Sequence, residues 1–159
     1  MDTSLKINVP VKKNEIILRD ETLGAQIAYY RSLKGITQRE LGKMVGVTKE
    51  TIKTDERRKP FVITDEVKER FKKIFKILEI ESKVKFDKYE ELIYSDRQVE
   101  ILSNLINEIN LPVNKIAVDL DIRLHRMKKY LSGETPIYKS HYYNMLKYRD
   151  NLKNKEREG

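Results

Sequence analysis

The amino-acid sequence predicts an all-α fold, and three observations carry this prediction. Only six glycines and four prolines occur in 159 residues, whereas Lys, Glu, Leu and Ile are frequent, a composition typical of a mainly helical chain. Apolar residues recur every three or four positions along most of the chain, as they do on one face of a helix. Residues that cap helix ends stand at the starts of these periodic runs.

Composition and charge limit the classes of function. The net charge of +8, from 33 Lys and Arg against 25 Asp and Glu, suits a polyanionic partner. The sequence contains no cysteine, which excludes disulfides and thiolate metal sites. No apolar run approaches the roughly 18–20 residues of a membrane span and no signal-peptide pattern opens the sequence, so we expect a cytoplasmic, nucleoid-associated protein without membrane contact.

Residues 1–20 are expected to form an N-terminal arm. Its short apolar groups leave four alternatives open: a strand at residues 15–18, a disordered leader, a basic arm that follows DNA phosphates, or a packing tail. A helix then starts at Thr22, and Gly35 ends it. The apolar positions of this helix are Leu23, Ile27 and Tyr30.

The stretch TQRELGKMVGVTKETIKTDER, which starts at Thr37, has the pattern of two short helices joined by a turn, a helix-turn-helix. Gly42 provides the small residue where the helices touch, and Gly46 tolerates the positive φ of the turn. Thr37 and Glu40 fit a capping box, and Thr48 caps the second helix. The inward apolar positions are Leu41, Val45, Val47 and Ile52.

Together with the preceding helix, this motif resembles a known family. The run LGAQIAYYRSLKGITQRELGKMVGVTKETI resembles the Cro/repressor type, or Xre family, of helix-turn-helix transcriptional regulators, and the resemblance covers about residues 22–80. It implies a lambda-repressor-like helical bundle in residues 21–80. In that family the second helix of the pair enters the DNA major groove and the first crosses the backbone.

The resemblance assigns roles to polar residues of the pair. Gln38 matches the Gln that opens the family's second helix, and we expect it to contact a phosphate or a neighbouring side chain. The helix that starts near Thr48 is expected to read base edges, because Lys donates to guanine, Glu accepts from cytosine and Thr contacts either kind of edge. Its base-reading residues are Lys49, Glu50, Lys53 and Thr54. The residues expected at phosphates are Arg39, Lys43, Arg57, Arg58 and Lys59.

Two residues depart from the family pattern. Asp55 stands where the family usually has an apolar or aromatic residue, and Arg58 stands where it often has Gly. Asp55 either closes an ion pair with a nearby Arg or marks an early end of the helix. The contacts around Arg57 depend on which alternative holds.

After Pro60, Thr64 and two acidic residues begin another helix. Its apolar face either completes the core of the first domain or forms a dimer surface, since many regulators of this type pair two copies. The apolar positions are Val67, Phe71, Ile74, Phe75 and Leu78. Residues 81–96 are expected to link two domains, with a short strand in IESKVKF or one or two helical turns in DKYEELIY.

Residues 97–152 are expected to form the second domain, so that the fold consists of tandem lambda-repressor-like helix-turn-helix bundles joined by a short linker. Ser95 and Gln98 fit a capping box at its start. A last helix is expected from about Lys139, and a flexible tail at residues 153–159.

The first motif recurs, in divergent form, as KIAVDLDIRLHRMKKYLSGE, which therefore resembles a second helix-turn-helix. When Leu41 is aligned with Ile116, Asp121 replaces Gly46 at the turn, and Asp tolerates the left-handed conformation better than most residues. Arg123 replaces the capping Thr48, so a side-chain cap is missing. The inward positions become Ile116, Ala117, Leu120, Ile122 and Met127.

The second motif carries the most one-sided charge of the chain. Residues 122–131 contain four positive charges and no acid, which favours phosphate contact over base reading. The competing interpretation keeps the fold and uses it for self-association. The residues expected to project are Arg123, His125, Arg126, Lys128 and Lys129.

Chemistry other than binding finds little support in the sequence. His125 and His141 have no Cys or second close His with which to bind a metal. Gly-rich phosphate loops, nucleophile elbows and paired acids are also missing. We therefore expect neither enzyme activity nor a metal or cofactor.

These observations predict a sequence-specific DNA-binding transcriptional regulator, in first place a repressor of phage or mobile-element type. Its partner would be double-stranded DNA, with a homodimer as one possible state. Two helix-turn-helix units in one chain would also cover two half-sites without dimerisation. Two alternatives stay open: an antitoxin-like protein-interaction module that autoregulates its own promoter, and a plasmid or phage replication-linked DNA binder.

Overall fold

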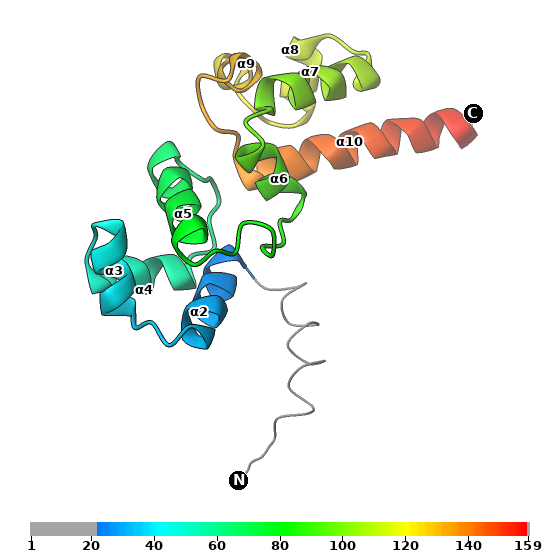
Figure 1. Ribbon diagram of the computed structural model, residues 1–159. Helices are drawn as coiled ribbons and strands as arrows, with labels where there is room; N and C mark the ends of the chain where they lie inside the picture. The colour runs from blue at the N-terminus through cyan, green and yellow to red at the C-terminus, as the bar shows by residue number, and fades with distance from the viewer. Residues whose placement is uncertain (1–21, 159) are drawn as a thin grey trace. The chain divides into compact units, whose positions relative to one another are not determined.

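The structure, a computed structural model, describes residues 22–158. These residues form nine α-helices and no strand, so the predicted all-α fold is confirmed (Figure 1). The helices are α2 (Leu23–Leu33), α3 (Gln38–Val45), α4 (Lys49–Arg57), α5 (Asp65–Ile77), α6 (Lys88–Tyr94), α7 (Gln98–Ile109), α8 (Val113–Asp119), α9 (Leu124–Ser132) and α10 (Lys139–Glu158). The arm predicted for residues 1–20, with its strand at 15–18, lies outside the described residues.

The described chain divides into two compact units. The first comprises the described part of Met1–Lys59 together with Glu69–Lys85, and the second comprises Pro60–Lys68 and the described part of Phe86–Gly159. This division differs from the predicted one, which placed a linker at residues 81–96 between domains at 21–80 and 97–152. Residues 81–85 belong to the first unit, and the rest of the expected linker belongs to the second.

Helix α6, Lys88–Tyr94, lies inside the expected linker, residues 81–96. Its capping box is complete: the Asp87 N–H donates to Glu90 Oε1 over 2.9 Å, and the Glu90 N–H donates to Asp87 Oδ1 over 2.7 Å. The helix buries Tyr89, Leu92 and Ile93, which explains why it packs as part of a unit. Of the two alternatives for this stretch, the helical turns are confirmed and the strand in IESKVKF is absent.

The first unit is built around α2, α3, α4 and the second half of α5. Thr22 caps α2, its side chain accepting from the Ala25 N–H over 3.1 Å. A Cβ placed on Gly24 would lie 2.2 Å from the Asp55 carbonyl oxygen, so only glycine lets α2 approach α4 this closely. The apolar face of α5 completes this core, as one of the two predicted alternatives stated. Its buried residues in the first unit include Phe71, Ile74 and Phe75, followed by Leu78 just after the helix.

Helices α3 and α4, with the turn between them, form the first helix pair. Gly46 ends α3 with φ 90°, as the turn requires. A Cβ on Gly42 would lie 2.7 Å from the Val47 carbonyl oxygen, which confirms it as the small contact. The capping box of Thr37 and Glu40 is present, and the Thr48 side chain caps α4. The predicted inward residues Leu41, Val45 and Ile52 are buried, and Val47 is partly buried.

Helices of the second unit repeat the order and spacing of those in the first. The intervals between the starts of α7, α8 and α9 equal those between the starts of α2, α3 and α4. Helices α8 and α9, with the turn between them, form the second helix pair. Asp121 in this turn has φ 57°, and α9 has no side-chain cap at Arg123, as the sequence indicated. Its inward residues Ile116, Ala117, Ile122 and Met127 are buried, and Leu120 is partly buried.

Two boundaries of the second unit differ from expectation. The predicted capping box of Ser95 and Gln98 is wrong, because Ser95 ends α6 and its Oγ donates to the Leu92 carbonyl over 3.0 Å. The Gln98 amide instead bonds the backbone of the segment after α9. Helix α10 continues to Glu158, through most of the predicted tail, because the sequence KNKERE consists largely of good helix formers.

Candidate nucleic-acid interface

The outer side of α4 carries the residues that the sequence predicted to read bases. Lys49 and Lys53 lie one turn apart, as do Glu50 and Thr54, so that four polar side chains stand close together on the helix surface. All four are exposed, and so are Thr48 and Arg57 at the helix ends. Ile52 and Asp55 lie on the opposite, buried side.

Helix α3 adds cations beside this surface. Arg39 and Lys43, predicted at phosphates, are exposed, and Lys59 after α4 is exposed as well. A shallow depression connects the starts of α3 and α4; its lining consists of Arg31, Thr37, Gln38, Arg39 and Lys49. Three of these side chains are cationic and none is acidic, and the nearby helix N-termini add positive potential from their backbone N–H groups.

A polar clamp fixes the helices behind the surface. Glu56 accepts from Arg31 Nε over 2.6 Å and from Gln38 Nε2 over 2.8 Å, and its side chain is only 6% exposed. Arg31 also donates to the Ile36 carbonyl over 2.8 Å. The clamp therefore joins α2, α3 and α4, and it confirms the neighbouring-side-chain alternative for Gln38.

Sequence reasoning missed Arg31 and Glu56, although one signal was present. Glu56 follows Ile52 by four residues on α4, so it lies on the same inward side as a core residue. A charged residue at such a position requires a partner, because burying an unpaired charge is costly. Arg31 in the last turn of α2 is that partner.

Asp55 closes ion pairs, as one of the two predicted alternatives stated. Its carboxylate is fully buried and accepts from Arg70 Nε over 2.6 Å and Arg70 Nη2 over 2.8 Å. Arg58 donates to the same carboxylate over 3.2 Å. Helix α4 continues to Arg57, so the alternative of an early helix end is wrong. Arg58, expected at a phosphate, is partly committed to this buried pair.

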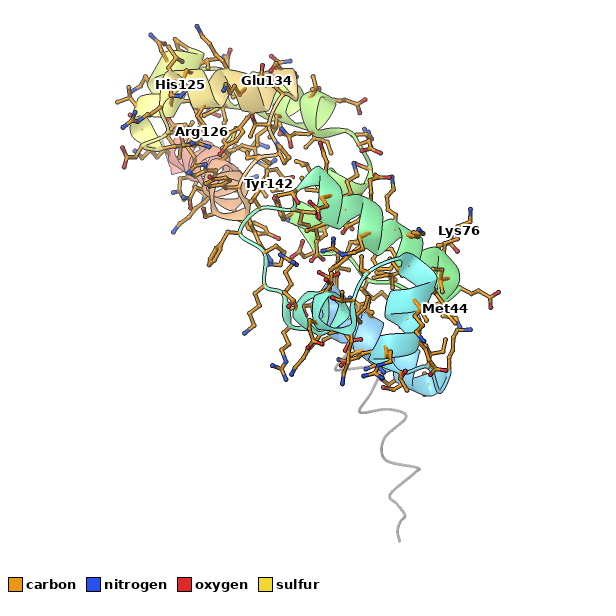
Figure 2. All side chains as sticks on the ribbon, turned by 90° about the vertical axis from the view of Figure 1, so that its left-hand side faces the viewer. Met44, Lys76, His125, Arg126, Glu134 and Tyr142 are labelled. Carbon is orange, nitrogen blue, oxygen red and sulfur yellow. The ribbon has the colours of Figure 1, made fainter. Side chains whose placement is uncertain are left out.

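The predicted cations of the second helix pair divide into two groups. Arg123, His125, Lys128 and Lys129 are exposed, although Lys129 pairs with Glu134 over 3.5 Å. Arg126 is instead partly buried, which corrects the expectation that it projects. In Figure 2 Arg126 lies on the side of α9 that faces α10, and His125 lies on the other side.

Arg126 belongs to an aromatic cluster formed by Tyr130, Tyr138 and His141. Its guanidinium lies over the Tyr138 ring, 5.2 Å from the centroid. The Tyr130 hydroxyl and His141 Nδ1 are 2.8 Å apart, and the rings of Tyr138 and His141 are stacked. Burial and the Arg126 charge lower the pKa of His141, which favours a neutral ring that packs. His141 is therefore a packing residue.

The same positions carry different chemistry in the two units. When the two helix pairs are aligned, the clamp residues of the first unit correspond to apolar residues of the second, all of them partly buried. Arg31 corresponds to Ile106, Gln38 to Val113 and Glu56 to Leu131. The second helix pair is thus held without the polar clamp of the first.

Comparisons with known proteins found no match from which a function could be assigned. No protein-family model, no curated protein and no solved structure matches the chain. Within residues 22–158, no group of three or more Asp, Glu and His side chains is placed to hold a metal ion. None of the described helices combines the length and the apolar character that crossing a membrane would require.

Proposed function

We propose that the protein is a sequence-specific, double-stranded DNA-binding transcriptional regulator, of the repressor type, that reads the major groove with α4. The observation that carries this proposal is the exposed row of hydrogen-bonding side chains on α4, backed by the Glu56 clamp and the buried Asp55 ion pairs. The major groove, about 12 Å wide, admits one α-helix. A recognition helix must be rigidly oriented, because base edges accept only well-aligned hydrogen bonds.

The exposed side chains would serve two purposes, base reading and phosphate contact. Lys49 and Lys53 donate hydrogen bonds of the kind that guanine O6 and N7 accept, and Glu50 accepts of the kind that cytosine N4 donates. Arg39 and Lys43 are charged and lie on α3, beside the reading helix. From there they would contact phosphates and fix the position of the protein along the duplex. The +8 net charge adds a sequence-independent attraction to DNA.

The decisive experiment is a mobility-shift titration across a salt series. The full-length protein is titrated with DNA from its own upstream region and with random DNA of equal length. We expect specific binding whose affinity falls steeply as salt rises. In Lys49→Ala with Lys53→Ala, we expect the preference for the specific DNA to fall by roughly 10-fold or more.

A charge-matched control separates reading from general attraction. Lys76→Ala with Lys155→Ala also removes two positive charges, but from exposed positions on α5 and α10. This control should keep the preference for the specific DNA. Wild-type protein that binds both DNAs equally at all salt concentrations would contradict the proposed function.

A further inference from the structure

The second helix pair exposes apolar side chains where the first pair exposes lysines. In the alignment of the two pairs, Val118 stands at the position of Lys43 and Leu124 at the position of Lys49. Val118 is 77% exposed and Leu124 is 40% exposed. Neither side chain is needed for the core, because the pair buries other residues for that purpose. These two exposed aliphatic side chains on neighbouring helices are therefore available for contact with another molecule.

Cations surround these two side chains. Lys115 lies one turn before Val118 on α8, and Lys128 lies one turn after Leu124 on α9. Helices α8 and α9 pack against each other, so these residues belong to one helix pair. We define the docking surface by its exposed residues, which are Lys115, Val118, Arg123, Leu124, His125 and Lys128.

Two exposed acidic residues, Asp119 and Asp121, lie in the same stretch of the chain, and Asp119 is already engaged. Asp119 accepts from the Tyr148 hydroxyl over 2.6 Å and pairs with Lys115 over 3.3 Å. These contacts lower the pKa of Asp119, the Tyr148 hydrogen bond being the largest cause. Asp121 stands two residues before Arg123, in the turn between the helices. Lys128 has no acidic neighbour within α9, whose sequence contains no acid.

We propose that the docking surface binds an acidic partner protein, which places apolar side chains against Val118 and Leu124. Carboxylates of such a partner complement the surrounding cations, and its apolar residues remove both aliphatic side chains from water. DNA fits less well, because phosphates gain nothing from Val118 at the position that corresponds to Lys43. A second copy of this surface is disfavoured as well, since the two-fold contact would bring like charges together. This inference concerns a different surface from the proposed function and does not rest on it.

The test uses the full-length chain and defined probes. The first probe is a synthetic helical peptide of about 20 residues with leucines along one face and glutamates on both flanks. Two matched peptides replace the glutamates by lysines or the leucines by alanines, and a fourth probe is a duplex of random DNA. Binding is followed by backbone amide chemical shifts of the protein.

We expect only the leucine-and-glutamate peptide to shift the amides of residues 113–129 in a saturable manner. Val118→Ser with Leu124→Ser, which keeps the charge, should weaken this binding by roughly 10-fold. Lys115→Ala with Lys128→Ala should weaken it mainly at low salt. All four positions are exposed, so these variants should stay folded.

Three outcomes would overturn the proposal. In the first, the peptide leaves these amides unshifted or all three peptides bind alike. In the second, the DNA duplex shifts these amides, which would make the second helix pair a DNA contact. In the third, the same amides shift with protein concentration alone, which would identify a second copy as the occupant. In each of these cases the proposed function still stands if the Lys49→Ala with Lys53→Ala variant is the one that loses specific DNA binding.

Discussion

The two helix pairs share their spacing but differ in what holds them together. Both have a residue with positive φ in the turn, Gly46 in the first and Asp121 in the second. At corresponding positions, however, the first pair buries Asp55 and the second buries Tyr130. This turn therefore needs a residue in the left-handed conformation and a buried side chain at the contact, whereas the chemistry of that side chain is free to change. That freedom allows the outer surfaces to serve different partners.

Removing Asp55 should have the largest effect on stability. Asp55→Ala leaves Arg70 and Arg58 without the carboxylate that both contact. We expect a loss of about 2–4 kcal/mol, near the lower end for a broken buried pair because both arginines keep some access to water. Tyr130→Phe, the corresponding change in the second unit, removes the hydroxyl that lies 2.8 Å from His141 Nδ1 and should cost only about 1 kcal/mol.

Urea denaturation of the full-length variants measures both changes. Lys53→Ala on the exposed side of α4 is the control and should change stability by less than about 0.5 kcal/mol. Equal losses in Asp55→Ala and Tyr130→Phe would refute the distinction between an ionic and an aromatic contact.

The polar clamp of the first unit can be exchanged for the apolar residues at the corresponding positions of the second unit. Glu56→Leu alone removes the carboxylate that accepts from the Arg31 guanidinium and the Gln38 amide, and we expect a loss of about 2 kcal/mol. The triple change Arg31→Ile, Gln38→Val, Glu56→Leu installs the residues of the second unit. Because well-packed apolar residues often replace a buried ion pair without loss, the triple variant should be more stable than the single one.

Urea midpoints of the single and triple variants decide this point, and a mobility shift with the specific DNA adds a second readout. A triple variant less stable than Glu56→Leu would mean that the two helix pairs are not interchangeable in their packing. Reduced specific binding by a stable triple variant would show that Gln38 or the clamp also orients α4.

The buried carboxyl groups of the two units differ in their partners. Asp55 accepts from arginines, whereas Glu90 accepts from the Asp87 N–H. Burial, the largest cause, raises the pKa of Glu90 to about 7, while the Asp87 hydrogen bond acts in the opposite direction. The unfolded chain has its ordinary value of about 4.3, so the folded chain binds this proton more tightly. The contribution to stability is therefore complete below about pH 4.3 and is lost as the pH rises through about 7.

Glu90→Gln keeps an acceptor for the Asp87 N–H and removes the charge. Between pH 5 and pH 8, the free energy of unfolding of wild type should fall by about 2 kcal/mol relative to this variant. This value follows from the raised pKa of Glu90, reduced because the side chain keeps some contact with water. Urea denaturation at both pH values measures the difference. If the free energy of unfolding changes equally in both proteins between these pH values, the raised pKa of Glu90 is contradicted.

The sequence predicted the helices and the outer residues of α4 because local signals determine them. Apolar period, the capping residues Thr37 and Thr48, and Gly46 at the turn all act within a few positions. The linker prediction differed from the structure because Tyr89 and its neighbours on α6 find their apolar partners far away in the sequence. Arg126 was misplaced for the same reason: its partner Tyr138 lies beyond α9, and a charge run alone does not reveal which member turns inward.

The smallest expected effect concerns the helix caps and distinguishes the two pairs most directly. Thr48→Ala removes the side chain that accepts from the Thr51 N–H over 3.2 Å and should cost about 1 kcal/mol. Arg123→Thr is the reverse experiment, because Arg123 already has extended backbone angles, φ −62° and ψ 140°, but gives α9 no side-chain cap. We expect it to stabilise the chain by about 0.5–1 kcal/mol. If urea denaturation finds Arg123→Thr neutral or destabilising while Thr48→Ala is costly, then the missing cap is not the reason for the difference, and Arg123 itself contributes to stability through its own contacts.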